Sequence, residues 1–117
     1  MRKKDEKIVA LKALTARGMI TEEMIQAEVG LMLLVQDECE SILRCYETYK
    51  WGTRYYLVVE FMDFSVRNLI DYQQKVITEG IIRYICGAVL KGLAAMHKKK
   101  IMHRDIKSDN ILINKEG

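Results

Sequence analysis

The sequence contains no proline and only three cysteines, and none of its apolar runs exceeds seven residues, the length of Val29 to Val35. A membrane-spanning helix needs about 20 mostly apolar residues, so we expect no membrane span. The basic start MRKK is not followed by the apolar stretch of a secretory signal peptide. Three cysteines are an odd number without close pairing, so we expect reduced thiols in a cytoplasmic protein.

A large excess of one charge is also absent. The 19 Lys and Arg residues and the 16 Asp and Glu residues leave a net charge of +3, which gives no reason to expect a nucleic-acid partner. Hydrophobic residues make up 50% of the 117 residues, which is enough for a core and argues against disorder over most of the chain. The length fits one ordinary domain or part of a larger one.

Without proline, element boundaries must come from glycine, charge and the period of the apolar residues. Thr21 followed by Glu22 and Glu23 is typical of a helix N-terminus, with a hydroxyl cap and acids at the positive end of the dipole. In chain order we predict a buried strand over 7–14, a helix from 21 to about 35, an aromatic-rich hairpin over 41–61, a short helix within 62–75, a long helix from 78 to about 98, an irregular loop over 101–110 and a short strand over 111–114.

Two charged residues fall on apolar faces. Lys12 shares a strand face with Ala10 and Leu14, and Glu28 shares a helical stripe with Met32. A buried charge is costly unless it is paired, so one interpretation is an ion pair between Lys12 and Glu28. The other is that both side chains lie at the edges of apolar faces and extend into water. The residues themselves leave both interpretations open.

The segment IMHRDIKSDNILIN, over 101–114, concentrates polar side chains between apolar pairs. The Asp105 carboxylate can accept a proton or orient a hydroxyl, Lys107 can neutralise developing negative charge, and the Asn110 carbonyl can ligate a hard cation such as Mg²⁺. Such a set suits phosphoryl transfer, in which positioning and charge stabilisation dominate catalysis. The alternative is a solvated charged turn between a helix and a strand.

These motifs carry a family resemblance. HRDIKSDN, over 103–110, matches the catalytic loop His-Arg-Asp-x-Lys-x-x-Asn of eukaryotic protein kinases at every specified position. VALK, over 9–12, is similar to the kinase Val-Ala-x-Lys strand, Glu28 falls where the kinase helix supplies its pairing Glu, and LVVEFM, over 57–62, resembles the strand that runs into the kinase hinge. The loop resembles the serine/threonine type, and in particular the sterile-type group with its Cdc42/Rac-activated branch.

The resemblance implies an α+β, protein-kinase-like two-lobe fold that is incomplete. Residues 1–62 would form part of the small lobe through the hinge, and 63–117 the start of the large lobe through the catalytic loop. The sequence holds no Gly-x-Gly-x-x-Gly loop and no Asp-Phe-Gly. We therefore expect a truncated, partial or degenerate kinase sequence that buries less than the roughly two thirds of its unfolded surface typical of a complete domain of this size.

The resemblance also assigns roles within the loop. Asp105 would be the catalytic base that orients the acceptor hydroxyl, and Lys107 would contact the transferred phosphate. Asn110 would hold Mg²⁺. Arg104 would bind a phosphorylated activation loop.

The implied cofactors are ATP and Mg²⁺. Lys12 would hold the α- and β-phosphates, and Glu28 would hold Lys12. Four further positions would enclose the adenine: the side chains of Ala10 and Leu112, and the backbone of Glu60 and Met62.

The function implied is transfer of the ATP γ-phosphoryl group to Ser or Thr hydroxyls of a protein substrate, with small-GTPase-linked regulation through regions that these residues do not contain. The alternative is a catalytically inactive kinase-like fragment or pseudokinase that acts by binding. We expect the 117-residue chain alone to be inactive, because the magnesium and phosphate cradle of the family is incomplete in it.

Overall fold

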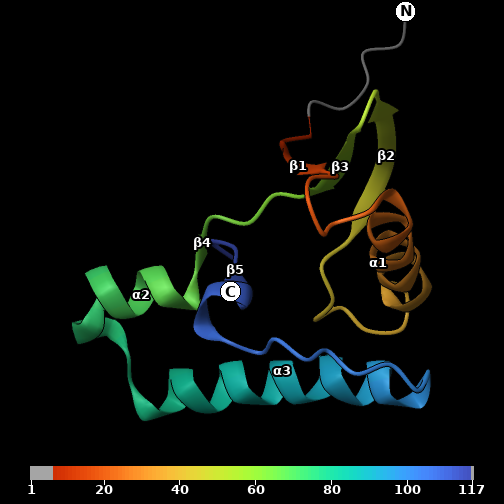
Figure 1. Cartoon of the computed structure of the whole chain (residues 1–117). Helices are drawn as coiled ribbons and strands as arrows, with labels where there is room; N and C mark the ends of the chain where they lie inside the picture. Colours follow the sequence, from red (N-terminus) through yellow and green to blue (C-terminus); the bar gives the residue numbers. More distant parts are fainter. Residues whose placement is uncertain (1–6, 117) are drawn as a thin grey trace, which may run out of the picture.

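The computed structural model describes residues 7–116, and it divides into two parts joined by the extended segment after β3 (Figure 1). The elements in chain order are β1 (Val9–Thr15), α1 (Glu22–Val35), β2 (Cys45–Trp51), β3 (Arg54–Glu60), β4 (Phe64–Ser65), α2 (Val66–Tyr72), the 3₁₀ turn η1 (Gln74–Val76), α3 (Glu79–Lys98), the 3₁₀ turn η2 (Ser108–Asn110) and β5 (Leu112–Ile113). The predicted strands and helices are present, but the prediction that the first strand is buried is wrong. No residue of β1 is buried, because β1 lies at the edge of its sheet. The two-residue strand β4 was not predicted.

The first part is an antiparallel sheet in the order β1-β3-β2. Strand β1 pairs with β3 from Val9 opposite Glu60 to Thr15 opposite Arg54. The β2–β3 hairpin turns at Gly52, whose φ of 60° is a conformation that glycine adopts without steric cost. Among the described residues, β1 forms one edge of this sheet.

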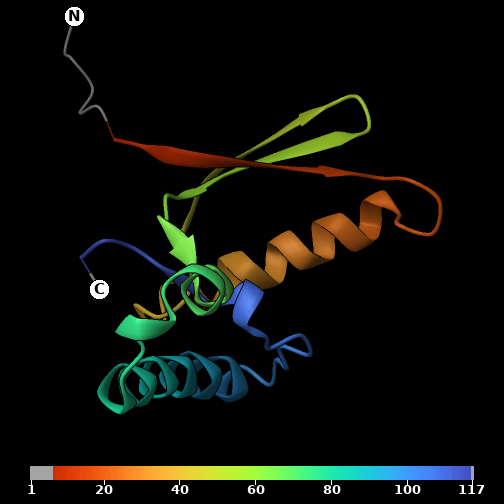
Figure 2. The ribbon, with the colours of Figure 1, turned by 90° about the vertical axis from the view of Figure 1, so that its left-hand side faces the viewer.

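Helix α1 packs on one face of the sheet (Figure 2). It begins at Thr21, whose Oγ1 accepts the N–H of Met24 at 3.3 Å. The apolar side of α1 and the facing residues of the hairpin form the core, to which β3 contributes most because its residues alternate between buried and half-exposed positions. The buried members of this cluster are Ile25, Cys45, Tyr55, Leu57 and Val59.

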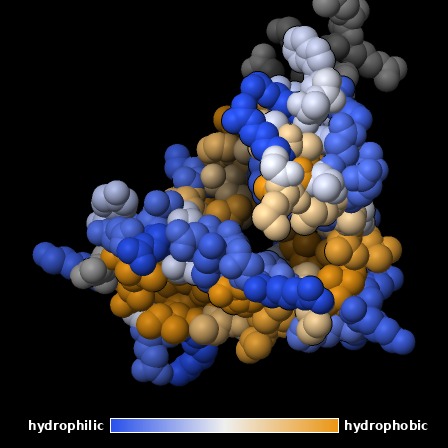
Figure 3. Space-filling view, in the orientation of Figure 1, coloured by the Kyte–Doolittle hydropathy of each residue, from blue (hydrophilic) through white to orange (hydrophobic). Residues whose placement is uncertain are grey.

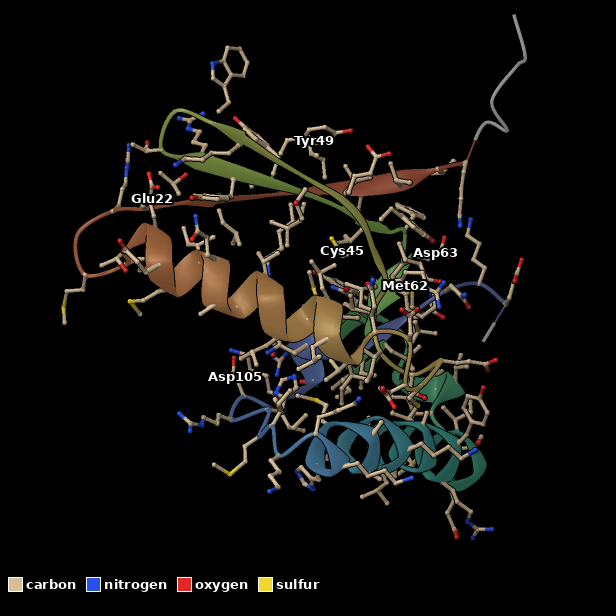
Figure 4. The ribbon with its side chains drawn as sticks, turned by 90° about the vertical axis from the view of Figure 1, so that its right-hand side faces the viewer. Glu22, Cys45, Tyr49, Met62, Asp63 and Asp105 are labelled. Carbon is tan, nitrogen blue, oxygen red and sulfur yellow. The ribbon has the colours of Figure 1, made fainter. Side chains whose placement is uncertain are left out.

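A polar network fastens the N-terminal end of α1 to the hairpin. The Nζ atom of Lys50 lies 2.6 Å from Glu22 Oε2, and the Tyr55 hydroxyl donates to the same oxygen at 3.2 Å. Gln26 Nε2, one turn along the helix, donates to the Tyr55 hydroxyl at 3.1 Å. The hydrogen bonds from Lys50 and Tyr55 hold the pKa of Glu22 below its ordinary value. Figure 4 shows Glu22 at the end of α1 that faces the hairpin.

The second part contains α2, α3 and the short β4–β5 pair. Helix α3 begins at Thr78, whose Oγ1 accepts the N–H of Ile81 at 3.3 Å. The loop between α1 and β2 packs closely against α3. Gly92 of α3 is buried there, and a side chain added at this position would lie 3.6 Å from Ser41. Beside this contact, Lys99 Nζ and Glu38 Oε1 are 2.9 Å apart. No helix in the described part of the chain is long and apolar enough to cross a membrane.

The chain exposes an unusually large surface. Its accessible surface is 9613 Å², whereas a compact monomer of this mass exposes roughly 6,600 Å² and its unfolded chain roughly 19,700 Å². The structure therefore buries about half of the unfolded surface, which confirms the expectation of less than two thirds. The space-filling view shows apolar residues at the surface of both parts (Figure 3).

The polar network on α1 predicts a pH-dependent stability. Because the folded-state pKa of Glu22 is lowered, its contribution should be present above the unfolded-state pKa and lost as pH falls through the folded-state pKa. We expect Glu22→Gln to lower the free energy of unfolding at neutral pH but not in strong acid, as measured by urea denaturation at a series of pH values. The matched variant Glu28→Gln, at an exposed residue of the same helix, should have little effect at any pH. Equal losses in both variants would contradict this account.

The exposed apolar surface predicts dye binding and self-association. We expect the chain alone to bind a hydrophobic dye and to associate through the free edge of β1 as its concentration rises. Leu11→Lys, at a 64% exposed position on this edge, should reduce the association measured by size-exclusion chromatography with light scattering. Tyr72→Lys, on α2, should not. A sharp monomer peak, no dye binding and a cooperative melt would disprove the prediction.

Candidate active site

The polar loop leaves α3 through a fixed helix end. The N–H of Lys100 donates to His97 O at 2.9 Å, and the N–H of Ile101 donates to Met96 O at 3.1 Å. Lys100 has a φ of 60°, so the helix ends in the left-handed conformation that more often carries glycine. This end directs the chain back along α3 toward β5 (Figure 1).

Three functional side chains predicted from the sequence come together in the loop. Asn110 Nδ2 donates to Asp105 O at 2.9 Å and to Asp105 Oδ2 at 3.0 Å. Lys107 Nζ lies 3.6 Å from the same carboxylate oxygen. The N–H of Asp105 donates to His103 Nδ1 at 3.2 Å, and Arg104 between them has a φ of 68°. A non-glycine residue in this region is strained, and such strain is frequent at functional sites.

The loop is attached to the segment that follows the sheet. The N–H of Val66 donates to Ile111 O at 2.8 Å, and the N–H of Asp63 donates to Ile113 O at 3.0 Å. Between these bonds, β4 pairs with β5. The Asp63 carboxylate accepts the N–H of Lys115 at 2.8 Å and lies 3.6 Å from Lys115 Nζ.

Asp63 is a positioning residue that sequence reasoning missed. Its side chain is only 18% exposed, and it joins the end of the sheet to the far end of the loop. The signal in the sequence is weak, since it is a single carboxylate shortly after an apolar strand. Figure 4 shows Met62 and Asp63 where the two parts of the chain meet, and Asp105 on the loop between α1 and α3.

The loop geometry supports proton acceptance and cation binding. Asp105 is exposed, and the donors from Asn110 and Lys107 converge on its Oδ2. Its Oδ1 has no hydrogen-bond partner among the described residues, and neither has Asn110 Oδ1. A carboxylate and an amide oxygen are therefore available, the first for a hydroxyl proton and the second for a hard cation. The described residues contain no cluster of three or more His, Cys, Asp or Glu side chains that could hold a metal.

The ion pair predicted between Lys12 and Glu28 is not formed. Both side chains are exposed, and no ion pair joins them in the described part of the chain. The prediction assumed that burial would force the two charges together, but both remain in water, where pairing two long side chains gains little. The other interpretation, that both extend into solvent, is the one observed. No described hydrogen bond or ion pair connects either residue to the Asp105 loop.

The remaining predicted nucleotide residues lie around the end of the sheet. Ala10 packs against the core, opposite Val59 of β3. The N–H of Glu60 donates to Arg44 O at 2.8 Å, whereas the backbone of Met62 has no hydrogen-bond partner among the described residues. Leu112 is exposed on β5, opposite Ser65. Hollows are found at 71–76 and 97–102, and neither is lined by these residues.

Comparison with known proteins gives a consistent match. The sequence model of the family described as Protein kinase domain matches residues 1–117. Serine/threonine-protein kinase MST20 of Pyricularia oryzae is 33% identical over 113 residues, covering 95% of this chain and 12% of the relative. Serine/threonine-protein kinase STE20 of Debaryomyces hansenii is 34% identical over 110 residues, or 93% and 10%, and serine/threonine-protein kinase PAK 4 of Homo sapiens is 31% identical over 112 residues, or 95% and 18%. The chain thus spans less than one fifth of the length of these relatives.

The contacts of Asn110 predict that it orders the loop. Removing its two hydrogen bonds to Asp105 by Asn110→Ala should speed backbone amide exchange at Asp105 about fivefold, because two such bonds in an exposed loop together contribute about 1 kcal/mol. The measurement is hydrogen exchange by nuclear magnetic resonance. Asp109→Ala is the matched control, since no hydrogen bond or ion pair is found for the Asp109 side chain in the described residues. Equal acceleration in both variants would show that Asn110 has no special role.

Proposed function

Because the chain belongs to the protein kinase domain family, we propose that the protein containing it is an ATP-dependent protein serine/threonine kinase. The observation that supports this most strongly is the contact of Asp105, Lys107 and Asn110 within one loop. Serine/threonine-protein kinases from fungi and from Homo sapiens are among its relatives. Transfer to protein Ser and Thr hydroxyls follows as the proposed reaction.

In this proposal the loop residues act on the acceptor and the transferred phosphate. Asp105 orients the Ser or Thr hydroxyl and accepts its proton at the carboxylate. Lys107 lies next to that carboxylate and neutralises charge on the transferred phosphoryl group. Asn110 keeps Asp105 in place through its amide nitrogen and has its amide oxygen available for Mg²⁺, which would neutralise phosphate charge when bound. Arg104 is proposed to bind a phosphorylated activation loop.

The nucleotide-binding roles are proposals of the same kind. The free N–H and C=O of Met62 and the C=O of Glu60 would bind the adenine edge, with Ala10 and Leu112 on its two faces. Lys12 would bind the α- and β-phosphates. Glu28 would pair with Lys12 in a nucleotide-bound form in which α1 lies closer to β1. The proposed boundary accordingly follows Met62, with a partial small lobe through the hinge over 1–62 and the start of the large lobe over 63–117.

A second candidate function is a kinase-like protein that binds without catalysis. One observation favours it: Lys12 and Glu28 form no ion pair among the described residues.

The proposal extends to location and regulation. A cytoplasmic location is supported by the three cysteines, Cys39, Cys45 and Cys86, all of which are free thiols. Small-GTPase-linked regulation rests on the resemblance of the loop to the Cdc42/Rac-activated branch. A requirement for ATP with Mg²⁺ follows from the family.

The decisive test is phosphate transfer by the natural gene product that contains these residues. We expect transfer from ATP and Mg²⁺ to Ser or Thr of a generic basic protein, lowered about 100-fold or more by Asp105→Asn through loss of the proton acceptor. Asp109→Asn, in the same loop, should leave the rate unchanged. A folded gene product that binds ATP without transferring phosphate would favour the non-catalytic function, and full activity in Asp105→Asn would refute the assigned role.

The 117-residue chain by itself should transfer no measurable phosphate. It lacks the Asp-Phe-Gly carboxylate and the glycine-rich loop with which the family holds magnesium and the phosphates. A radiolabelled ATP assay on the purified chain, with Asp105→Asn as the blank, measures this. Transfer that Asp105→Asn abolishes would contradict the prediction.

A further inference from the structure

Helix α1 has a second apolar stripe on the side away from the sheet. Met24, Ala27, Leu31 and Leu34 repeat at intervals of three, four and three residues, which places them along one line of the helix. We call this line the outer stripe. Ile25, Val29 and Met32, the residues that pack against the sheet, form a different line. The outer stripe therefore contributes nothing to the core described above.

The outer stripe is open to solvent. Met24 is 55% exposed, Leu31 46% and Leu34 53%. Figure 2 shows that the sheet covers only one side of α1, and Figure 3 shows apolar surface gathered over this helix. A line of three large apolar side chains and one alanine over three helical turns, at the spacing of a coiled-coil seam, is suited to contact with another helix.

The charges that flank the outer stripe are all acidic. Helix α1 contains Glu22, Glu23 and Glu28 and no basic residue. Glu22 is paired with Lys50, but Glu23 and Glu28 have no ion-pair partner among the described residues. In a heptad that places Met24 and Leu31 at a, Glu23 occupies a g position and Glu28 the following e position, the pair that contacts a partner helix in a coiled coil.

The acidic residues beside the outer stripe indicate which kind of helix could bind it. A second copy of α1 would bring only acidic or neutral residues opposite Glu23 and Glu28, and like charges in these positions are destabilising. A helix with Lys or Arg beside its apolar stripe would instead form attractive pairs with both. We propose that the outer stripe of α1 is a docking surface for a basic amphipathic helix of a partner protein.

The test uses two synthetic three-heptad peptides with Leu at a and d, one with Lys and the other with Glu at e and g. Fluorescence anisotropy of each labelled peptide is followed as the 117-residue chain is added, at dilutions where light scattering gives the monomer. We expect the Lys peptide to bind about tenfold more tightly than the Glu peptide, since two cross-helix pairs change from attractive to repulsive. Reversing both flanking charges, in Glu23→Lys with Glu28→Lys, should reverse the preference.

Single variants distinguish binding at the outer stripe from non-specific binding to other exposed apolar residues. Leu31→Gln should weaken the Lys peptide about tenfold, because one apolar anchor is lost. Leu90→Gln, at a 64% exposed position on α3, is the matched control and should change nothing. The proposal is overturned if neither peptide binds, if both bind alike, or if Leu90→Gln weakens binding as much as Leu31→Gln. It is also overturned if the chain forms a dimer that Leu31→Gln dissociates, because a second copy would then occupy the stripe.

Discussion

The arrangement of the candidate site depends on the pairing of two short segments, 63–66 and 111–113. These segments are distant in sequence, and their backbone bonds attach the loop that contains Asp105 to the segment that follows the sheet. The half-buried carboxylate of Asp63 strengthens this junction through Lys115. One end of the loop is fixed here and the other by the left-handed end of α3 at Lys100. Because both ends are fixed, Asp105, Lys107 and Asn110 are held in contact with one another.

In the proposed site, the residues that would bind the acceptor hydroxyl are more ordered than those that would bind the nucleotide. The acceptor side is ordered by local contacts within a few residues of Asp105. The nucleotide side depends on α1 meeting the sheet at Glu28, and there the two predicted partners stay in water. The network of Glu22, Lys50 and Tyr55 holds only the N-terminal end of α1 to the hairpin. The position of Glu28 relative to Lys12 is thus the part of the site that a bound nucleotide or partner would have to change.

Features that depend on interactions between residues close in sequence could be predicted, and features that depend on distant partners could not. The helix starts at Thr21 and Thr78 and the hairpin over 41–61 were predictable because they rest on local chemistry. The loop roles came from a dense motif whose residues contact one another in the fold. The prediction for Lys12 and Glu28 failed because sequence alone does not give the burial of either residue. The roles of Asp63, β4 and Lys100 were missed because each depends on a backbone geometry or a distant partner that leaves little trace in composition.

The central claim is that the loop forms a phosphoryl-transfer site in which Asn110 supplies a ligand for the metal. Paramagnetic broadening by Mn²⁺, used in place of Mg²⁺ with ATP, measures this directly in the nuclear magnetic resonance spectrum of the natural gene product that contains these residues. The account predicts broadening centred on Asn110 and Asp105, dependent on ATP and lost in Asn110→Ala but kept in Asp109→Ala. Broadening confined to other residues, or unchanged in Asn110→Ala, would contradict it.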